Sequence, residues 1–89
     1  MTLKEVGIVI GKKLNKSHYE TISHFLYIIS FENTEVKDGG ILIGAYGRGK
    51  TIAKAKADYC KQIRGQILVM DAYKRTRKEI QLPPKITVK

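Results

Sequence analysis

The segment Thr51–Gly65, TIAKAKADYCKQIRG, contains the one helix that the sequence predicts. Thr51 is a favourable N-cap residue, and Gly65 is a favourable C-terminal stop. The apolar residues between them recur at helical spacing and are expected to face a sheet: Ile52, Ala55, Tyr59 and Ile63. Strand patterns flank this helix on both sides, so the segment decides the fold class.

Three strands are predicted before the helix. Val6–Ile10 alternates apolar side chains around small ones, and Ile41–Ile43 begins the third strand. His24–Phe31 is rich in β-branched and aromatic residues and has the clearest strand pattern, with its odd-numbered positions on one face. Residues 11–17 are expected to form a polar connection, and residues 32–40 are expected to form a turn region.

Two more strands are predicted after the helix. Gln66–Met70 has the pattern of a buried strand, and Glu79–Leu82 forms a short strand that ends at two prolines. The order is β-β-β-α-β(-β), which predicts an α+β fold with one antiparallel sheet and one helix packed on one face. Residues 1–89 fit a single domain, in which Pro83–Lys89 is expected to be a tail.

The charge is unevenly distributed along the chain. Residues 1–47 carry five lysines and five acidic residues, which cancel. Residues 48–89 carry twelve Lys and Arg against three acidic residues and therefore hold the whole net charge of +9. Self-repulsion of this size disfavours the compact state, so a polyanionic partner is the natural explanation. The alternative is a solvated face that aids solubility.

Gly44–Thr51, GAYGRGKT, matches the phosphate-binding pattern G-x-x-x-x-G-K-[ST], and Ile67–Asp71 imitates the strand that completes a magnesium site. Nucleotide hydrolases, however, repeat parallel βαβ units of about 30 residues each. Only 38 residues follow Thr51, and the strands predicted before it are joined by short turns. We therefore expect no catalysis and no cofactor. Arg48 and Lys50 at the helix N-terminus remain a candidate anion-binding site.

Other reactive or aromatic residues are given structural roles. His18 and His24 lack further ligands at metal-binding spacing, and Cys60 is expected to be a buried small hydrophobic residue rather than a reactive thiol. The aromatic residues of the 24–31 strand are assigned to the core rather than to base stacking: Phe25, Tyr27 and Phe31. Tyr46 and Tyr73 are better stacking candidates, because each lies beside basic residues at a strand end.

The sequence also sets expectations about the protein's surroundings. It contains no apolar stretch of the roughly 20 residues that a membrane-spanning helix needs, and its start lacks a signal-peptide pattern. A lone cysteine cannot form an internal disulfide, which favours a reducing compartment. We expect a cytoplasmic protein without membrane contact. A homodimer or a bound ligand would add stability to so small a core.

From about Gly40 to Pro83 the chain resembles short uncharacterised proteins carried by prophages. The shared pattern is a G-x-G-x-T turn at Gly47–Thr51, an I-x-G-x-x-L-V segment at Ile63–Val69, and a basic stretch before R-x-E-I at Arg77–Ile80. The strand order and the Thr-led helix also resemble HicB-type antitoxin domains. The resemblance implies a mobile-element protein that binds nucleic acid or blocks a host nucleic-acid enzyme. It assigns no functional residue.

We therefore predict a non-enzymatic nucleic-acid-binding accessory protein that contacts the phosphate backbone, with DNA and RNA both open as ligands. The candidate contact residues are all basic: Arg48, Lys50, Lys54, Lys61, Arg64, Lys74, Arg75, Arg77 and Lys78. No base-reading element is recognisable in the sequence. The alternative is a phage-encoded inhibitor, of the anti-CRISPR or anti-restriction type, that binds a host protein.

Overall fold

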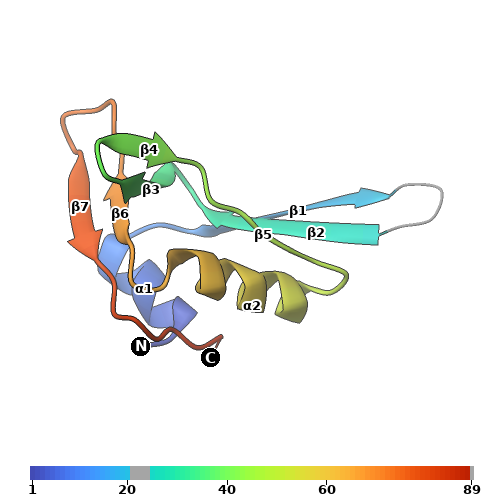
Figure 1. Ribbon diagram of the computed structural model, residues 1–89. Helices are drawn as coiled ribbons and strands as arrows, with labels where there is room; N and C mark the ends of the chain where they lie inside the picture. The colour runs from blue at the N-terminus through green and yellow to red at the C-terminus, as the bar shows by residue number, and fades with distance from the viewer. Residues whose placement is uncertain (21–24, 89) are drawn as a thin grey trace.

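The computed structural model describes residues 1–20 and 25–88. Two helices and seven strands are described (Figure 1), and they confirm the α+β class. In chain order they are α1 Leu3–Ile10, β1 Leu14–Glu20, β2 Phe25–Phe31, β3 Thr34–Asp38, β4 Ile41–Ile43, β5 Gly47–Gly49, α2 Ile52–Ile63, β6 Ile67–Met70 and β7 Lys78–Gln81.

The described strands form two antiparallel sheets instead of the single sheet predicted. One sheet has the order β1-β2-β5, and the other has the order β4-β3-β6-β7. The chain changes sheet at the tight β2–β3 turn, where Asn33 adopts a left-handed conformation with φ of 48°, and returns to the first sheet at β5. In Figure 1 the β1–β2 hairpin extends away from the body, and α2 lies along β2 and β5.

The prediction of a strand at Val6–Ile10 is wrong, because these residues belong to helix α1. Thr2 and Glu5 form a reciprocal capping box at its start, and Gly11 ends it with φ of 67°. Leu3, Val6 and Ile10 are buried at helical spacing. The apolar side chains of residues 6–10 therefore lie on several sides of the helix, and some of them remain exposed to solvent.

Three described strands, β1, β3 and β5, were not predicted, and the first two lie in segments that we expected to be connections. Residues 14–17 begin β1, whose polar side chains are mostly exposed and whose backbone pairs with β2 from Leu14↔Phe31 onward. Residues 34–38 form β3, which pairs with both β4 and β6. Backbone pairing holds both strands in place although their side chains give weak strand signals. The predicted strand start at His24 lies outside the described residues.

Helix α2 and the strands β4, β6 and β7 confirm their predictions. Thr51 Oγ1 accepts a hydrogen bond from the Lys54 N–H at 3.1 Å, and Gly65 follows the last turn with φ of 69°. Three of the four apolar residues expected to face the sheet are buried: Ala55, Tyr59 and Ile63. The fourth, Ile52, is 36% exposed at the first turn.

One cluster of buried side chains contains residues from both helices and from both sheets. It extends to Leu82 and Ile86, which are 2% and 7% exposed. Residues 83–88, expected to be a tail, lie against the start of α1, where the Leu3 N–H donates to Thr87 O at 2.8 Å. Thr2 and Thr87 also form a parallel bridge, so the two ends of the chain stabilise each other.

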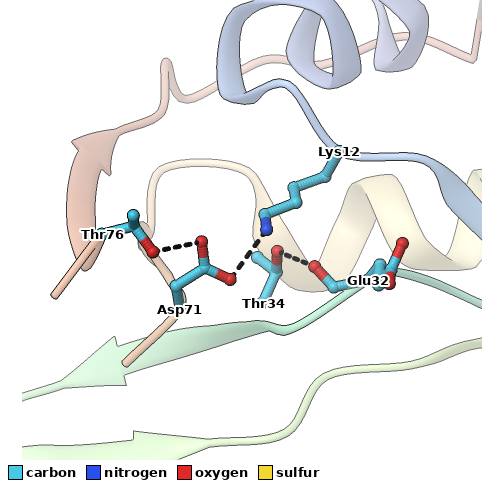
Figure 2. A network of polar contacts seen from close by, with 5 residues as sticks. All are labelled: Lys12, Glu32, Thr34, Asp71 and Thr76. Atoms are coloured by element: carbon cyan, nitrogen blue, oxygen red, sulfur yellow. Dashed lines mark hydrogen bonds and ion pairs between the residues drawn. The ribbon is translucent and has the colours of Figure 1, made fainter. Parts of the chain in front are cut away.

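A polar network links the start of β1 to the ends of β2 and β6 (Figure 2). Lys12 Nζ donates to Asp71 Oδ1 at 2.7 Å, and Thr76 Oγ1 donates to Asp71 Oδ2 at 3.0 Å. The Asp71 N–H donates to Asn33 O at 3.0 Å, and Thr34 Oγ1 donates to Glu32 O at 2.9 Å. The network therefore fixes the point where the chain passes between the two sheets.

The Lys12–Asp71 pair gives a prediction for acid stability. The hydrogen bond from Lys12 lowers the pKa of Asp71, with further lowering by Thr76 and by the charges of Lys12 and Lys74. A carboxyl pKa that is lower in the folded state adds stability at neutral pH, and this stability is lost as pH falls. The difference in unfolding free energy between wild type and Asp71→Asn should therefore shrink from about pH 6 to about pH 3.

Urea denaturation at several pH values measures this difference. Asp38→Asn is the matched control, because Asp38 is exposed and makes no ion pair within residues 1–20 and 25–88. Its difference from wild type should be small at every pH. A difference for Asp71→Asn that stays constant down to about pH 3 would contradict the stabilising role of the pair.

Candidate nucleic-acid interface

The segment that matches the phosphate-binding pattern is extended rather than wrapped into a loop. Gly47–Gly49 form β5, which pairs antiparallel with β2 through Tyr27↔Gly49 and Ile29↔Gly47. A phosphate-binding loop instead curls its backbone N–H groups around the anion. The match in sequence is therefore not accompanied by the backbone geometry that the chemistry needs.

The glycines of this segment let α2 lie directly on β5. A Cβ atom on Gly47 would lie 2.7 Å from Tyr59 N and would also meet Ala55 O, and one on Gly49 would lie 2.6 Å from Ala55 N. Each contact is with the helix backbone, which cannot move aside as the end of a flexible side chain can. The glycine spacing is thus explained by close packing of helix on strand.

The polar groups of the segment are also engaged by α2. The Arg48 N–H donates to Asp58 Oδ2 at 2.9 Å, and Gln62 Nε2 donates to Tyr46 O at 2.6 Å. Thr51 caps the helix through its hydroxyl. A carboxylate at the Arg48 amide disfavours a second anion at that donor, so Asp58 already occupies one backbone amide of the predicted anion-binding site.

The candidate contact residues of β5 and α2 point in different directions. Side chains alternate along a strand, so Arg48, between two glycines that face α2, projects from the opposite face of the sheet. Lys54 and Lys61 are exposed and lie two turns apart on the side of α2 away from the core. Lys50 precedes the helix and Arg64 is its C-cap residue, both exposed.

The other four candidates lie in the connection between β6 and β7 and at the first residue of β7. We call them the basic turn: Lys74, Arg75, Arg77 and Lys78. All four are exposed, and the connection folds on itself through bonds from the Lys74 N–H to Asp71 O and from the Arg77 N–H to Lys74 O. Tyr73, beside them, is 91% exposed. The turn thus presents a cluster of cations next to an accessible aromatic ring.

Lysines from the neutral first half of the chain compensate the acidic residues beside the basic turn. Lys12 pairs with Asp71, and Lys37 Nζ pairs with Glu79 Oε1 at 3.1 Å. Arg77 pairs with the other oxygen of Glu79, and hydrogen bonds from Lys37 and then Arg77 lower the pKa of Glu79. The other three cations of the turn make no ion pair within the described residues. We did not predict from the sequence that lysines of the first half neutralise acidic residues of the second half, because the charges of the two halves were counted separately.

The nine candidate residues therefore do not form one surface. The basic turn follows β6, whereas α2 leads into its opposite end, and Figure 1 shows the two at opposite ends of the four-stranded sheet. Four extended residues separate them by roughly 13 Å. The structure brings together the four residues of the basic turn, keeps the α2 cations as a second group, and sets Arg48 apart.

The remaining expectations concern buried groups. Ile29 and Phe31 are buried, and Tyr27 packs against the core, which confirms the core assignment of the β2 aromatics whose side chains are described. The side chain of Phe25 lies outside the described part. Cys60 is buried, as expected, and burial raises the pKa of its thiol. Burial also raises the pKa of Tyr59 to about 12, while its hydroxyl accepts the Phe31 N–H.

Metal-binding clusters, membrane-spanning helices and known relatives give no functional assignment for the described part of the chain. No cluster of three or more His, Cys, Asp or Glu within the described residues is arranged to hold a metal ion. No helix in the described part of the chain is long and apolar enough to cross a membrane. No protein-family model, curated protein or solved structure matches the chain. Function is therefore inferred from the chain's own geometry and charge.

The packing of α2 on β5 predicts that the two glycines are essential for stability. Gly47→Ala and Gly49→Ala should each lower the free energy of unfolding by about 1–3 kcal/mol or more, because the new methyl group meets helix backbone. Urea denaturation of each variant measures the loss.

Gly40→Ala is the matched control. Its Cβ would meet no atom within 4 Å. The control should change stability by less than about 1 kcal/mol. If Gly47→Ala and Gly49→Ala proved as stable as the control, the glycines would need another role, and phosphate binding would regain support.

Proposed function

We propose that this protein is a non-enzymatic nucleic-acid-binding accessory protein that contacts the phosphate backbone through the basic turn. The observation that carries the proposal is the pairing of Asp71 and Glu79 with lysines of the first half. These pairs leave Lys74, Arg75 and Lys78 without ion-pair partners in the part of the chain that the structure describes. Exposed cations that are not held in ion pairs can neutralise phosphates and release the counterions of a polyanion.

Tyr73 suggests the kind of nucleic acid that the turn would bind. Its ring is exposed beside the cations, an arrangement that suits stacking on an unpaired base. Stacking on one base is worth about 1–3 kcal/mol and tolerates any base. Single-stranded nucleic acid is therefore the favoured ligand. Resemblance to prophage-borne proteins supports an origin in a phage or another mobile element.

The second candidate function is inhibition of a host protein by direct contact. It is favoured by β4, which lies at the edge of the four-stranded sheet and carries Ile41 and Ile43, 68% and 46% exposed. An exposed edge strand with apolar side chains is suited to pairing with a strand of another chain. This surface does not use the basic turn, so the two functions depend on different residues.

Salt dependence of binding tests the first proposal. If the four cations of the basic turn each neutralise one phosphate, log K against log salt should have a slope of about −3 to −4. Replacing Lys74, Arg75, Arg77 and Lys78 with Ala should weaken binding of all sequences similarly and bring the slope close to zero. Fluorescence anisotropy with labelled single-stranded DNA and RNA at several salt concentrations measures both quantities.

A variant that replaces Lys50, Lys54, Lys61 and Arg64 with Ala removes the same charge from α2 and its ends. It should keep most of the slope, because the basic turn remains intact. Equal losses in both variants would indicate general attraction to a basic protein. No binding to DNA or RNA at low salt would sink the proposal and leave the host-protein inhibitor as the remaining candidate.

A further inference from the structure

A groove of about 390 Å³ runs along α1. Its apolar walls come from α1, the start of β1, the end of β2 and the C-terminal segment: Leu3, Gly7, Ile8, Leu14, Phe31 and Val88. Leu3 and Phe31 are 3% and 4% exposed, whereas Ile8 is 71% exposed. The groove therefore has a sealed apolar floor and an exposed apolar lip.

The other residues that line the groove are all lysines: Lys4, Lys12, Lys16 and Lys56. They come from α1, the α1–β1 connection, β1 and α2, so they surround the groove rather than follow one element. Lys12 pairs with Asp71. Within the described residues, the other three make no ion pair with a carboxylate. An apolar floor is thus combined with three uncompensated positive charges.

We propose that this lysine-rimmed groove binds a small amphiphilic carboxylate, with its apolar body on the floor and its head among Lys4, Lys16 and Lys56. Ligand sites are mostly apolar, with a few placed polar groups that fix orientation, and begin at about 300 Å³. A water molecule occupies about 30 Å³ in the liquid, so the groove holds roughly a dozen non-hydrogen atoms. This inference does not rest on the proposed nucleic-acid function.

An alkyl body fits the floor better than a flat nucleobase. Phe31 is tilted against Tyr59, with ring centroids 5.6 Å apart, and is nearly inaccessible, so its face is not available for stacking. The remaining walls are aliphatic. Lysine ammonium groups act as compact point charges and place no planar requirement on the head that they bind. A medium-chain carboxylate satisfies both the floor and the rim.

Decanoate is a suitable probe because it has a dozen non-hydrogen atoms. Isothermal titration calorimetry should show decanoate binding at least tenfold more tightly than acetate, which lacks the body, or decyltrimethylammonium, which reverses the charge. Amide resonances of Gly7, Ile8 and Leu14 should shift during a decanoate titration followed by NMR. Equal binding of acetate or of the cationic analogue would overturn the proposal.

Charge-reversal variants locate the head of the ligand. Lys16→Glu with Lys56→Glu should weaken decanoate binding at least tenfold, and Ile8→Ser should weaken it severalfold by removing part of the lip. Lys13→Glu with Lys61→Glu makes the same charge change outside the groove lining and should stay within about twofold of wild type. Equal weakening by both double variants, or none by either, would overturn the assignment.

Each variant is first compared with wild type by circular dichroism and thermal unfolding. Lys56 is half-buried, so Lys56→Gln provides a milder substitution if the double variant unfolds. It should weaken decanoate binding by a smaller factor in a folded protein. Binding equal to wild type in folded Lys56→Gln, together with unchanged binding in Lys16→Glu, would likewise contradict the proposal.

Discussion

Close contact between α2 and β5 is the constraint on which the rest of the structure depends. Glycines at positions 47 and 49 bring strand backbone against helix backbone. Asp58 then binds the Arg48 N–H, and Gln62 binds the Tyr46 carbonyl just before β5. The buried Tyr59 accepts the Phe31 N–H at 3.0 Å and ties the helix to β2 as well. This contact holds the three-stranded sheet against α2 and encloses the core between them. The charged side chains therefore lie on the outside of the molecule.

The fold was predictable where side-chain periodicity and caps agreed, and not where they conflicted. Thr51, Gly65 and the apolar spacing between them located α2. Around α1 the apolar run at 6–10 suggested a strand, and the spacing of Thr2 and Glu5, which form a capping box in the structure, was not used in that prediction. In β1 the polar side chains carry almost no signal, because pairing with β2 is made by the backbone. A short apolar run is compatible with both the helical and the strand period, so helix-capping residues distinguish the two structures.

The sequence predicted where basic residues are concentrated in the chain, but not which of them lie together on one surface of the molecule. The basic run at 74–78 was visible in the sequence, and the structure keeps it exposed and together. The contribution of Lys12 and Lys37 was not visible, because each lies more than forty residues from its partner in the sequence. Gly44–Thr51 shows the opposite case, since a complete motif match serves helix packing here. Motifs define ligand sites only in the backbone geometry that their chemistry requires.

The most direct test is one NMR experiment on the isotopically labelled protein. Amide resonances are followed first with a short single-stranded oligonucleotide at low salt, and then with ATP and magnesium. We expect the oligonucleotide to shift the amide resonances of residues 73–78, and ATP to leave the amide resonances of residues 47–51 unchanged. Saturable shifts of residues 47–51 with ATP, and none at the basic turn with the oligonucleotide, would contradict this expectation.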